Sequence, residues 1–215
     1  MVMEKCYGER FIGSAAKDMR LEIHGTPGNA LGCYLDGAEI IVHGNAQDAV
    51  GDTMNDGKII VYGSAGDALG YAMRGGNIFI RNDSGYRTGI HMKEYKEKKP
   101  VIIIGGKTGS FLGEYLAGGL IIVLGIGIDE IPVGNFTGTG MHGGKIFIRS
   151  KAPLPKLPKQ VLAEIASAEE LEEIIPYIKE FASFFGYVAR ELIESKFYLL
   201  KPNVKNPYKQ LYTAN

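Results

Sequence analysis

Apolar and glycine residues recur along this chain at a nearly constant spacing, so the sequence forms a series of similar units. The segment Gly44–Tyr62 is followed directly by Gly63–Arg81, which carries nearly the same pattern position by position. Followed outward, one aligned glycine takes the positions Gly32, Gly51, Gly70, Gly89, Gly113 and Gly138. The last two steps are longer than the others and indicate insertions at Lys93–Lys99 and Gly127–Asn135. Self-similarity at a fixed period of about 20 to 50 residues predicts a stack of coils.

Each unit contains a short apolar run that predicts a β-strand. Such short β-branched runs between glycines are typical of strands and turns, and a unit of this length has no room for an ordinary helix. The third residue after the aligned glycine is always large and apolar: Leu35, Met54, Met73, Met92, Leu116 and Met141. Glycine makes up 30 of the 215 residues, about twice its usual share. These features predict an all-β solenoid of parallel strands, with about seven coils spaced about 4.8 Å apart.

The alternation within each strand indicates which residues point inward. Glu22 lies between Leu21 and Ile23, so these two apolar residues are expected inside and Glu22 outside. The same register places these pairs inside: Ile40/Val42, Ile59/Val61, Ile78/Ile80, Val101/Ile103, Ile121/Val123 and Ile146/Ile148. The outward column is then Ile41, Ile60, Phe79, Ile102, Ile122 and Phe147. An apolar stripe of this size indicates a covered surface. We expect the chain's own C-terminal helices to cover it, with a partner subunit as the alternative.

The chain divides into four predicted regions. Residues 1–19 form an N-terminal cap, residues 20–152 the solenoid, residues 153–200 an α-helical appendage, and residues 201–215 an extended tail. The appendage follows a linker with three prolines, which neither a helix nor a strand ladder accommodates. Stacked coils need such terminal segments, because an end coil otherwise exposes its apolar interior.

Three helical segments are predicted within the appendage. The first contains Val161, Leu162 and Ile165, which would share one helical face. The second begins at a capping box formed by Ser167 and Glu170, and Pro176 should end or bend its first turns. Its apolar side comprises Leu171, Ile174, Ile175, Ile178 and Phe181. The third is Tyr187–Ser195.

Composition excludes several classes of function. The 24 basic and 24 acidic residues balance, so there is no basic field for nucleic acid. No apolar run approaches the length of about 18 residues that a membrane span needs, and the first residues lack the features of a signal peptide. Two cysteines, Cys6 and Cys33, favour a reducing compartment over a disulfide scaffold. We therefore expect a cytoplasmic protein.

Two polar columns are candidates for chemistry. His24 and His43 are one repeat apart and should stack on adjacent coils, in a column that continues through Tyr62 and Arg81. The pair could bind a metal, but the column offers no third ligand, which favours a surface ladder. Asn29, Asp48 and Asp67 form a second column. Short polar side chains of this kind commonly bond turn backbone, and a cation between the two carboxylates is the alternative.

The remaining motifs give no catalytic constellation. Gly138–Gly143 matches the dinucleotide pattern GxGxxG, but it lies inside the repeat rather than at a strand-to-helix turn. There is no GxSxG elbow, and Ser110 occupies a variable position of its unit. Cys6 and Cys33 belong to no CxxC motif and are expected to be buried thiols. We therefore predict no catalytic, cofactor or metal residue in this chain.

The repeated unit, as in Gly63–Ile80 and Gly105–Gly125, resembles the GXGXG repeat domain in the C-terminal part of the glutamate synthase large subunit. The similarity covers roughly residues 20–150, and the C subunit of formylmethanofuran dehydrogenase is a more distant match. The resemblance implies a right-handed, single-stranded parallel β-helix. It also implies a structural role beside partner subunits that carry the amidotransferase, FMN and iron–sulfur functions.

Three functions remain open on this reading. The first is a non-catalytic subunit of a glutamate-synthase-type complex, which transfers glutamine amide nitrogen or another amine to 2-oxoglutarate. The second is a scaffold subunit of a formylmethanofuran dehydrogenase-like complex. The third is an independent homo-oligomeric binding protein. An enzyme that acts alone would need a polar cluster such as Asp48/Asp67 to be essential.

Overall fold

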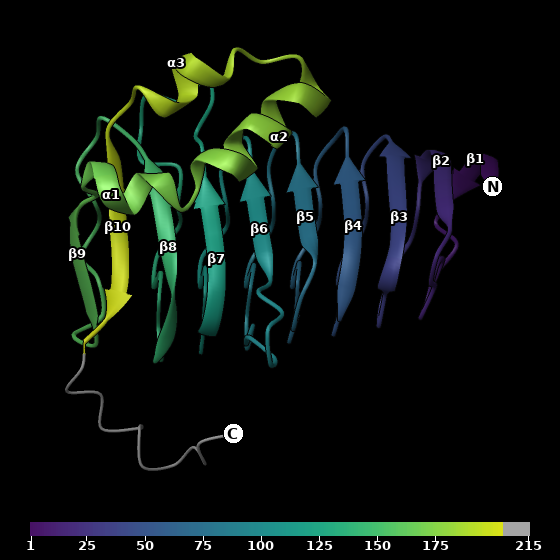
Figure 1. The fold of residues 1–215 in the computed structure, drawn as a ribbon, viewed down its shortest axis with the longest axis horizontal. Coiled ribbons are helices and arrows are strands. Elements are labelled where there is room, and N and C mark those ends of the chain that lie inside the picture. Colours follow the sequence, from purple (N-terminus) through teal and green to yellow (C-terminus); the bar gives the residue numbers. More distant parts are fainter. Residues whose placement is uncertain (204–215) are drawn as a thin grey trace.

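The computed structural model describes residues 1–203 and shows a parallel-stranded β-solenoid with a helical appendage (Figure 1). Eight strands run parallel to one another in sequence order, and one sheet of ten strands has the order β1-β2-β3-β4-β5-β6-β7-β8-β10-β9. The parallel strands are β1 (Val2–Tyr7), β2 (Arg20–Thr26), β3 (Asp36–His43), β4 (Asp56–Val61), β5 (Asn77–Ile80), β6 (Val101–Ile104), β7 (Ala117–Val123) and β8 (Gly143–Arg149). The predicted stack of parallel strands is confirmed.

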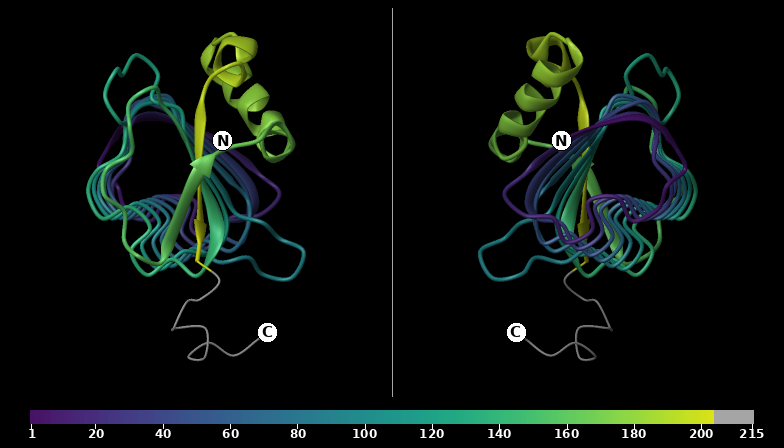
Figure 2. Two further views of the ribbon diagram at one scale, coloured as in Figure 1. Left: turned by 90° about the vertical axis from the view of Figure 1, so that its left-hand side faces the viewer. Right: turned by 90° about the vertical axis from the view of Figure 1, so that its right-hand side faces the viewer.

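A continuous apolar core fills the interior of the stack. The inward strand residues and the large apolar residue of each turn belong to one buried cluster, which extends from Cys6 in β1 to Leu200 in β10. Met54 and Met73 are both fully buried in it. Viewed along the stack, the coils superpose closely, and the two longer loops project from different sides (Figure 2). The aligned spacing in the sequence therefore arises because each coil repeats the packing of its neighbour.

The turn before each strand is built around the aligned glycine. Gly51 has φ +68°, and a Cβ atom there would lie 2.5 Å from Cδ1 of Ile78 in β5. The residues two positions away on either side, Ala49 and Thr53, also have positive φ, at 57° and 52°. Only glycine meets both the backbone conformation and the close approach at the central position. This requirement explains why the glycine recurs at every coil.

The predicted register is wrong at one strand. In β6 the inward residues are Ile102 and Ile104, which pair with Ile78 and Ile80. Val101 and Ile103 face outward instead. Two glycines, Gly105 and Gly106, follow this strand, and the prediction took Gly105 as the residue that ends the unit. In the structure Gly106 takes that place, because its amide donates to the carbonyl of Asn82, which ends the unit before.

The first residues add a further parallel strand to the stack. β1 lies within the segment expected to cap the first coil, and it pairs with β2 in parallel, with Met3 opposite Ile23. Its ladder shifts register between Met3 and Cys6, where Lys5 has φ 59°. A bulge of this kind on an edge strand discourages pairing with another chain.

The appendage contains three helices and, contrary to prediction, two strands. The helices are α1 (Ala168–Glu172), α2 (Ile175–Phe185) and α3 (Ala189–Ile193), and the strands are β9 (Val161–Ile165) and β10 (Phe197–Pro202). The capping box of Ser167 and Glu170 is confirmed at the start of α1. Pro176 lies in the first turn of α2, so a break separates α1 from α2 as expected. Gly186, with φ 74°, ends α2.

The expected helix at Val161, Leu162 and Ile165 is wrong, since these residues form β9. β9 pairs antiparallel with β10, and β10 pairs antiparallel with β8. The partner strand comes from residues far along the chain, so the local apolar spacing did not reveal it. The predicted tail begins inside β10 at Lys201 and Pro202, and its residues 204–215 lie outside the described residues.

The helices cover the outward face of the sheet, as predicted. Figure 1 shows them over the part of the sheet toward β10, while β1 and β2 extend beyond them. A second buried cluster lies between the two layers. Its sheet residues are Ile41, Ile60, Phe79, Val101, Ile103, Leu120, Ile122 and Phe147, and its appendage residues include Ile174, Ile178, Phe181, Phe185, Leu192 and Leu199. The outward apolar column is therefore buried by the chain itself.

Candidate functional site

A cluster of two imidazoles and one carboxylate lies on the outward face at the ends of β2 and β3. Glu22, His24 and His43 bring one ligand atom each to within 4.8 Å of one another. The strand pairing creates this arrangement, because His24 lies directly opposite His43. Glu22 lies two residues before His24 on the same strand, and alternation places both on one face. Among residues 1–203, this is the single group of three such side chains with that spacing.

Hydrogen bonding and ring stacking hold the cluster together. Glu22 Oε1 lies 2.6 Å from His43 Nε2. The rings of His24 and His43 stack with their centroids 4.5 Å apart and their planes 15° from parallel. The predicted histidine ladder is therefore confirmed.

The ladder continues to the edge of the helical cover. The Tyr62 ring stacks on His43 at 5.2 Å, and its hydroxyl donates to the carbonyl oxygen of Phe184 at 3.1 Å. Tyr62 also meets the Phe185 ring edge-on. The cluster thus adjoins the C-terminal end of α2, at the point where the covered part of the outward face begins.

The charge of Glu22 is favoured in this arrangement. The hydrogen bond with His43 is the main cause that lowers the pKa of Glu22, and the charges of Arg20 and His24 add to it. The carboxylate is therefore ionised at neutral pH, as metal ligation requires. Two imidazoles and a carboxylate are ligands suited to zinc and other first-row divalent metals.

A third ligand thus joins the two histidines, although their own column of the stack offers none. It lies in the neighbouring outward position of β2 rather than on a further coil. The alternation of Glu22 and His24 was visible in the sequence, together with the stacking of His24 on His43. The two-residue alternation along the strand, combined with the repeat that stacks His24 on His43, would have predicted the cluster.

The second polar column serves the backbone of the turns. Oδ1 of Asp48 accepts a hydrogen bond from the amide of Asp67 at 2.9 Å, and Oδ1 of Asp67 accepts one from the amide of Tyr86 at 2.8 Å. These bonds join successive coils, so the expected bonding to turn backbone is confirmed for both aspartates. The carboxylates take the role of side-chain caps for a backbone that makes tight turns.

The remaining motif residues are packed into the solenoid. Residues 138–142 form the last turn and Gly143 begins strand β8, so the motif lacks the strand-to-helix context of a dinucleotide site. Ser110 Oγ accepts the amide of Asn135 from the next coil at 3.1 Å.

Both cysteines are free and buried, as expected. Burial is the first cause that raises the pKa of Cys6, and the neighbouring Glu9 carboxylate raises it further. Cys33 Sγ contacts Ser14 Oγ. A raised pKa keeps a thiol protonated and unreactive, so Cys6 fits a packing role.

Exposed aromatic residues lie on the turns of several coils. Tyr34 and Phe136 are 56% and 57% exposed, and Tyr115 stacks on His91 with the ring centroids 5.1 Å apart. Tyr34, Tyr115 and Phe136 also have positive φ, at 57°, 53° and 61°. Bulky side chains in this conformation are strained. We call these three residues with His91, which lie on separate turns along the stack, the aromatic ridge.

The helices of the appendage are short, and the longest of them has 11 residues. Within residues 1–203, none is long and apolar enough to cross a membrane.

Fold and surface together define a repeat protein: a parallel β-solenoid with a glycine at each turn and a helical cover on one face of its sheet. The chain matches the GXGXG motif family over residues 2–205 and therefore belongs to that family. It is 48% identical over 224 residues to uncharacterized protein MJ1350 of Methanocaldococcus jannaschii, covering 100% of this chain and 86% of that protein.

Proposed function

We propose that this chain is a non-catalytic structural subunit of a glutamate-synthase-type complex. In that role it holds an amidotransferase subunit and an FMN- and iron–sulfur-containing subunit in register. Those partners would carry nitrogen from glutamine, or from another amine, to 2-oxoglutarate in the cytoplasm. The observation that supports the proposal most strongly is the match to the GXGXG motif family over residues 2–205.

The use of the motif residues also supports a structural role. The repeated glycine and the large apolar residue after it serve coil packing, as at Gly51 and Met54. Asp48 and Asp67 bond the backbone of adjacent coils. A rigid stack of this kind gives partners a fixed, extended surface, as solenoid proteins commonly do.

The aromatic ridge is the surface that best fits a partner subunit. Aromatic residues are enriched in protein interfaces. Tyr34 and Phe136 are exposed while their backbone is in the left-handed region, so the fold itself gains little from aromatic side chains there. A contact with another protein would compensate for that strain.

Affinity purification from the native cell, followed by mass spectrometry, tests this function. We expect identified amidotransferase and FMN–iron–sulfur subunits to copurify. A molybdenum- or tungsten-containing partner would point instead to a formylmethanofuran dehydrogenase-like complex. A chain that elutes alone, as a homo-oligomer, would contradict both assemblies.

Substitutions on the ridge sharpen the test. Tyr115→Gly and Phe136→Gly remove the rings and suit the positive φ at both positions, so the melting temperature should not fall. We expect both variants to lose the copurifying subunits. Tyr95→Ala is the matched control, because Tyr95 is 49% exposed but lies in the Lys93–Lys99 insertion. Unchanged copurification by both ridge variants would exclude the ridge as the interface.

A further inference from the structure

The outward face of the sheet ends, beyond the helical cover, in a set of side chains that have the composition of a metal site. We infer that Glu22, His24 and His43 bind one divalent cation of the zinc class across strands β2 and β3. The inference is independent of the function proposed above, since it rests on different residues and is tested by metal binding rather than by copurification.

The ligand set suits such an ion. Two imidazoles and one carboxylate serve as the three protein ligands of zinc sites that keep a fourth position open for water. The three ligand atoms already lie within 4.8 Å of one another. In a tetrahedral site with bonds of about 2.0–2.1 Å, ligand atoms lie about 3.3 Å apart. The required contraction is small for partly exposed side chains on a rigid pair of strands.

Binding an ion requires the side chains of the cluster to rotate. The two imidazole rings are nearly parallel, and they would turn about their side-chain bonds to direct one nitrogen each to a common point. Glu22 Oε1 and His43 Nε2 are 2.6 Å apart, so an ion between these atoms takes the place of their hydrogen bond, and the proton of that bond passes to the other ring nitrogen or to solvent. The side chains of His43 and Glu22 are 34% and 32% exposed, which leaves room for that rotation and a path for the ion.

The nearest strand cation is paired with another carboxylate, although its charge still acts on Glu22. Arg20, the nearest cation on β2, forms an ion pair with Glu39 on β3 at 3.4 Å. Tyr62 forms one wall of the site and is held by its bond to the Phe184 carbonyl. An ion held between His24 and His43 would join two adjacent coils at the end of the stack that the helices do not cover.

Titration of the metal-free protein with Zn²⁺ tests the inference directly. We expect one zinc ion per chain by calorimetry, and a tetrahedral visible spectrum when Co²⁺ replaces it. Glu22→Gln, His24→Ala and His43→Ala should each weaken zinc binding by at least about tenfold, which is the scale on which loss of even an outer partner acts. Amide exchange in residues 20–26 and 36–43 should slow on zinc binding in the wild-type protein.

His91→Ala is the matched control. His91 also contacts two rings, stacked on Tyr115 and edge-on to Tyr71, but the metal-ligand cluster does not include it. Its removal should leave zinc affinity unchanged. All four substituted side chains lie at the surface, so the melting temperature of each metal-free variant checks that the fold is intact. An absence of stoichiometric binding in the wild-type protein, or binding that survives in all three cluster variants, would overturn the inference.

Discussion

The two faces of the β-sheet are both apolar along much of their length, but they are buried in different ways. The inner face belongs to a core that runs from β1 to β10, and each coil repeats the contacts of the last. The outer face is buried only where the appendage reaches it, and its buried residues begin at Ile41. Beyond that point the outward positions are Glu22, His24 and His43. A repeat thus specifies its own interior, whereas its exterior depends on a segment that comes later in the chain.

The largest effect should come from a charge placed in the inner core. Met73 is fully buried, and Met73→Asp leaves an unpaired carboxylate among apolar side chains at a cost of several kcal/mol. We expect loss of the cooperative thermal transition followed by circular dichroism. Arg74→Asp, at the next and exposed position, should melt close to the wild-type temperature. A normally folded Met73→Asp protein would refute the inward register.

Truncating an outward-facing side chain should reduce the stability of the protein strongly only where the helices cover the sheet. Phe79 is fully buried between the sheet and the appendage, so Phe79→Ala should reduce the free energy of unfolding by about 3–5 kcal/mol. His43→Ala, on the uncovered part of the same face, removes ring stacking and one exposed ion pair and should change it by about 1 kcal/mol. Urea unfolding measures both. Similar losses for the two variants would mean that the outer face is uniform.

Acid should loosen the helical cover before it disrupts the stack. The pKa of Glu170 is lowered from 4.5 to about 2, first by the backbone amide of Ser167 and then by the Lys201 ammonium. A depressed folded-state pKa gives stability that is present above about pH 4.5 and is lost as the pH falls toward about 2. Glu170→Gln should therefore flatten the pH dependence of unfolding in that window. Identical acid titrations of variant and wild type would contradict this role.

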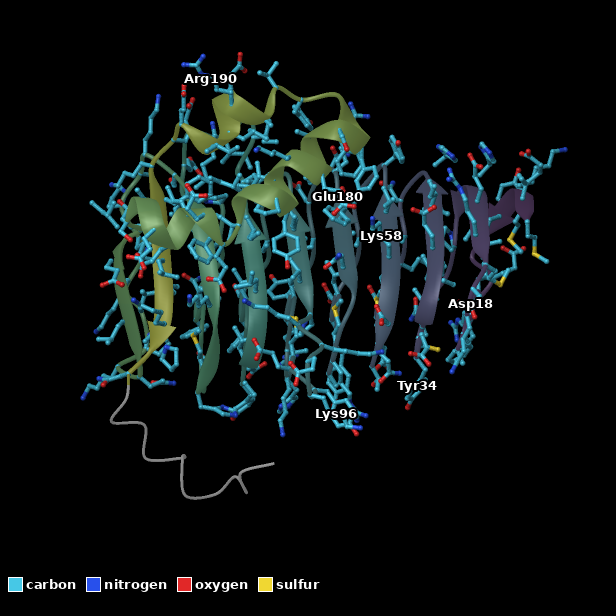
Figure 3. The ribbon with its side chains drawn as sticks, viewed as in Figure 1. Asp18, Tyr34, Lys58, Lys96, Glu180 and Arg190 are labelled. Carbon is cyan, nitrogen blue, oxygen red and sulfur yellow. The ribbon has the colours of Figure 1, made fainter. Side chains whose placement is uncertain are left out.

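The smallest effect is expected at the polar margin of the cover. Lys58 in β4 forms an ion pair with Glu180 in α2, where the edge of the appendage meets the sheet (Figure 3). Both side chains are about a third exposed or less, so a double-mutant cycle with Lys58→Met and Glu180→Gln should give a coupling of about 0.2–1 kcal/mol. A coupling of several kcal/mol would show that charge, rather than apolar burial, attaches the helices.

The sequence was sufficient to predict the parts of the fold that repeat. The aligned glycines, the buried methionines and the outward apolar column all follow from one unit, because each coil meets the same neighbours. The register failed at Val101, where Gly105 and Gly106 offered two alignments. Applying the longer step between Gly89 and Gly113 to Ile78 would have given Ile102 as the inward residue.

The parts that do not repeat were harder to predict. β9 exists because β10 lies beside it, and no local pattern at Val161 indicates so distant a partner. The cluster of Glu22, His24 and His43 combines alternation along one strand with stacking between two. Alternation alone brings Glu22 beside His24, and stacking alone brings His24 beside His43. The pairing of the two strands brings all three together.

The position of β10 has a consequence for synthesis. This strand supplies Leu200 to the inner core and Leu199 to the outer one, and it follows all three helices in the chain. Because domains begin to fold from the N-terminus as they are made, the coils can stack while Phe79, Ile122 and Phe147 still face water. A nascent chain therefore displays an apolar strip until its helices and β10 have emerged. During that interval it depends on chaperones or on rapid completion of folding to avoid aggregation.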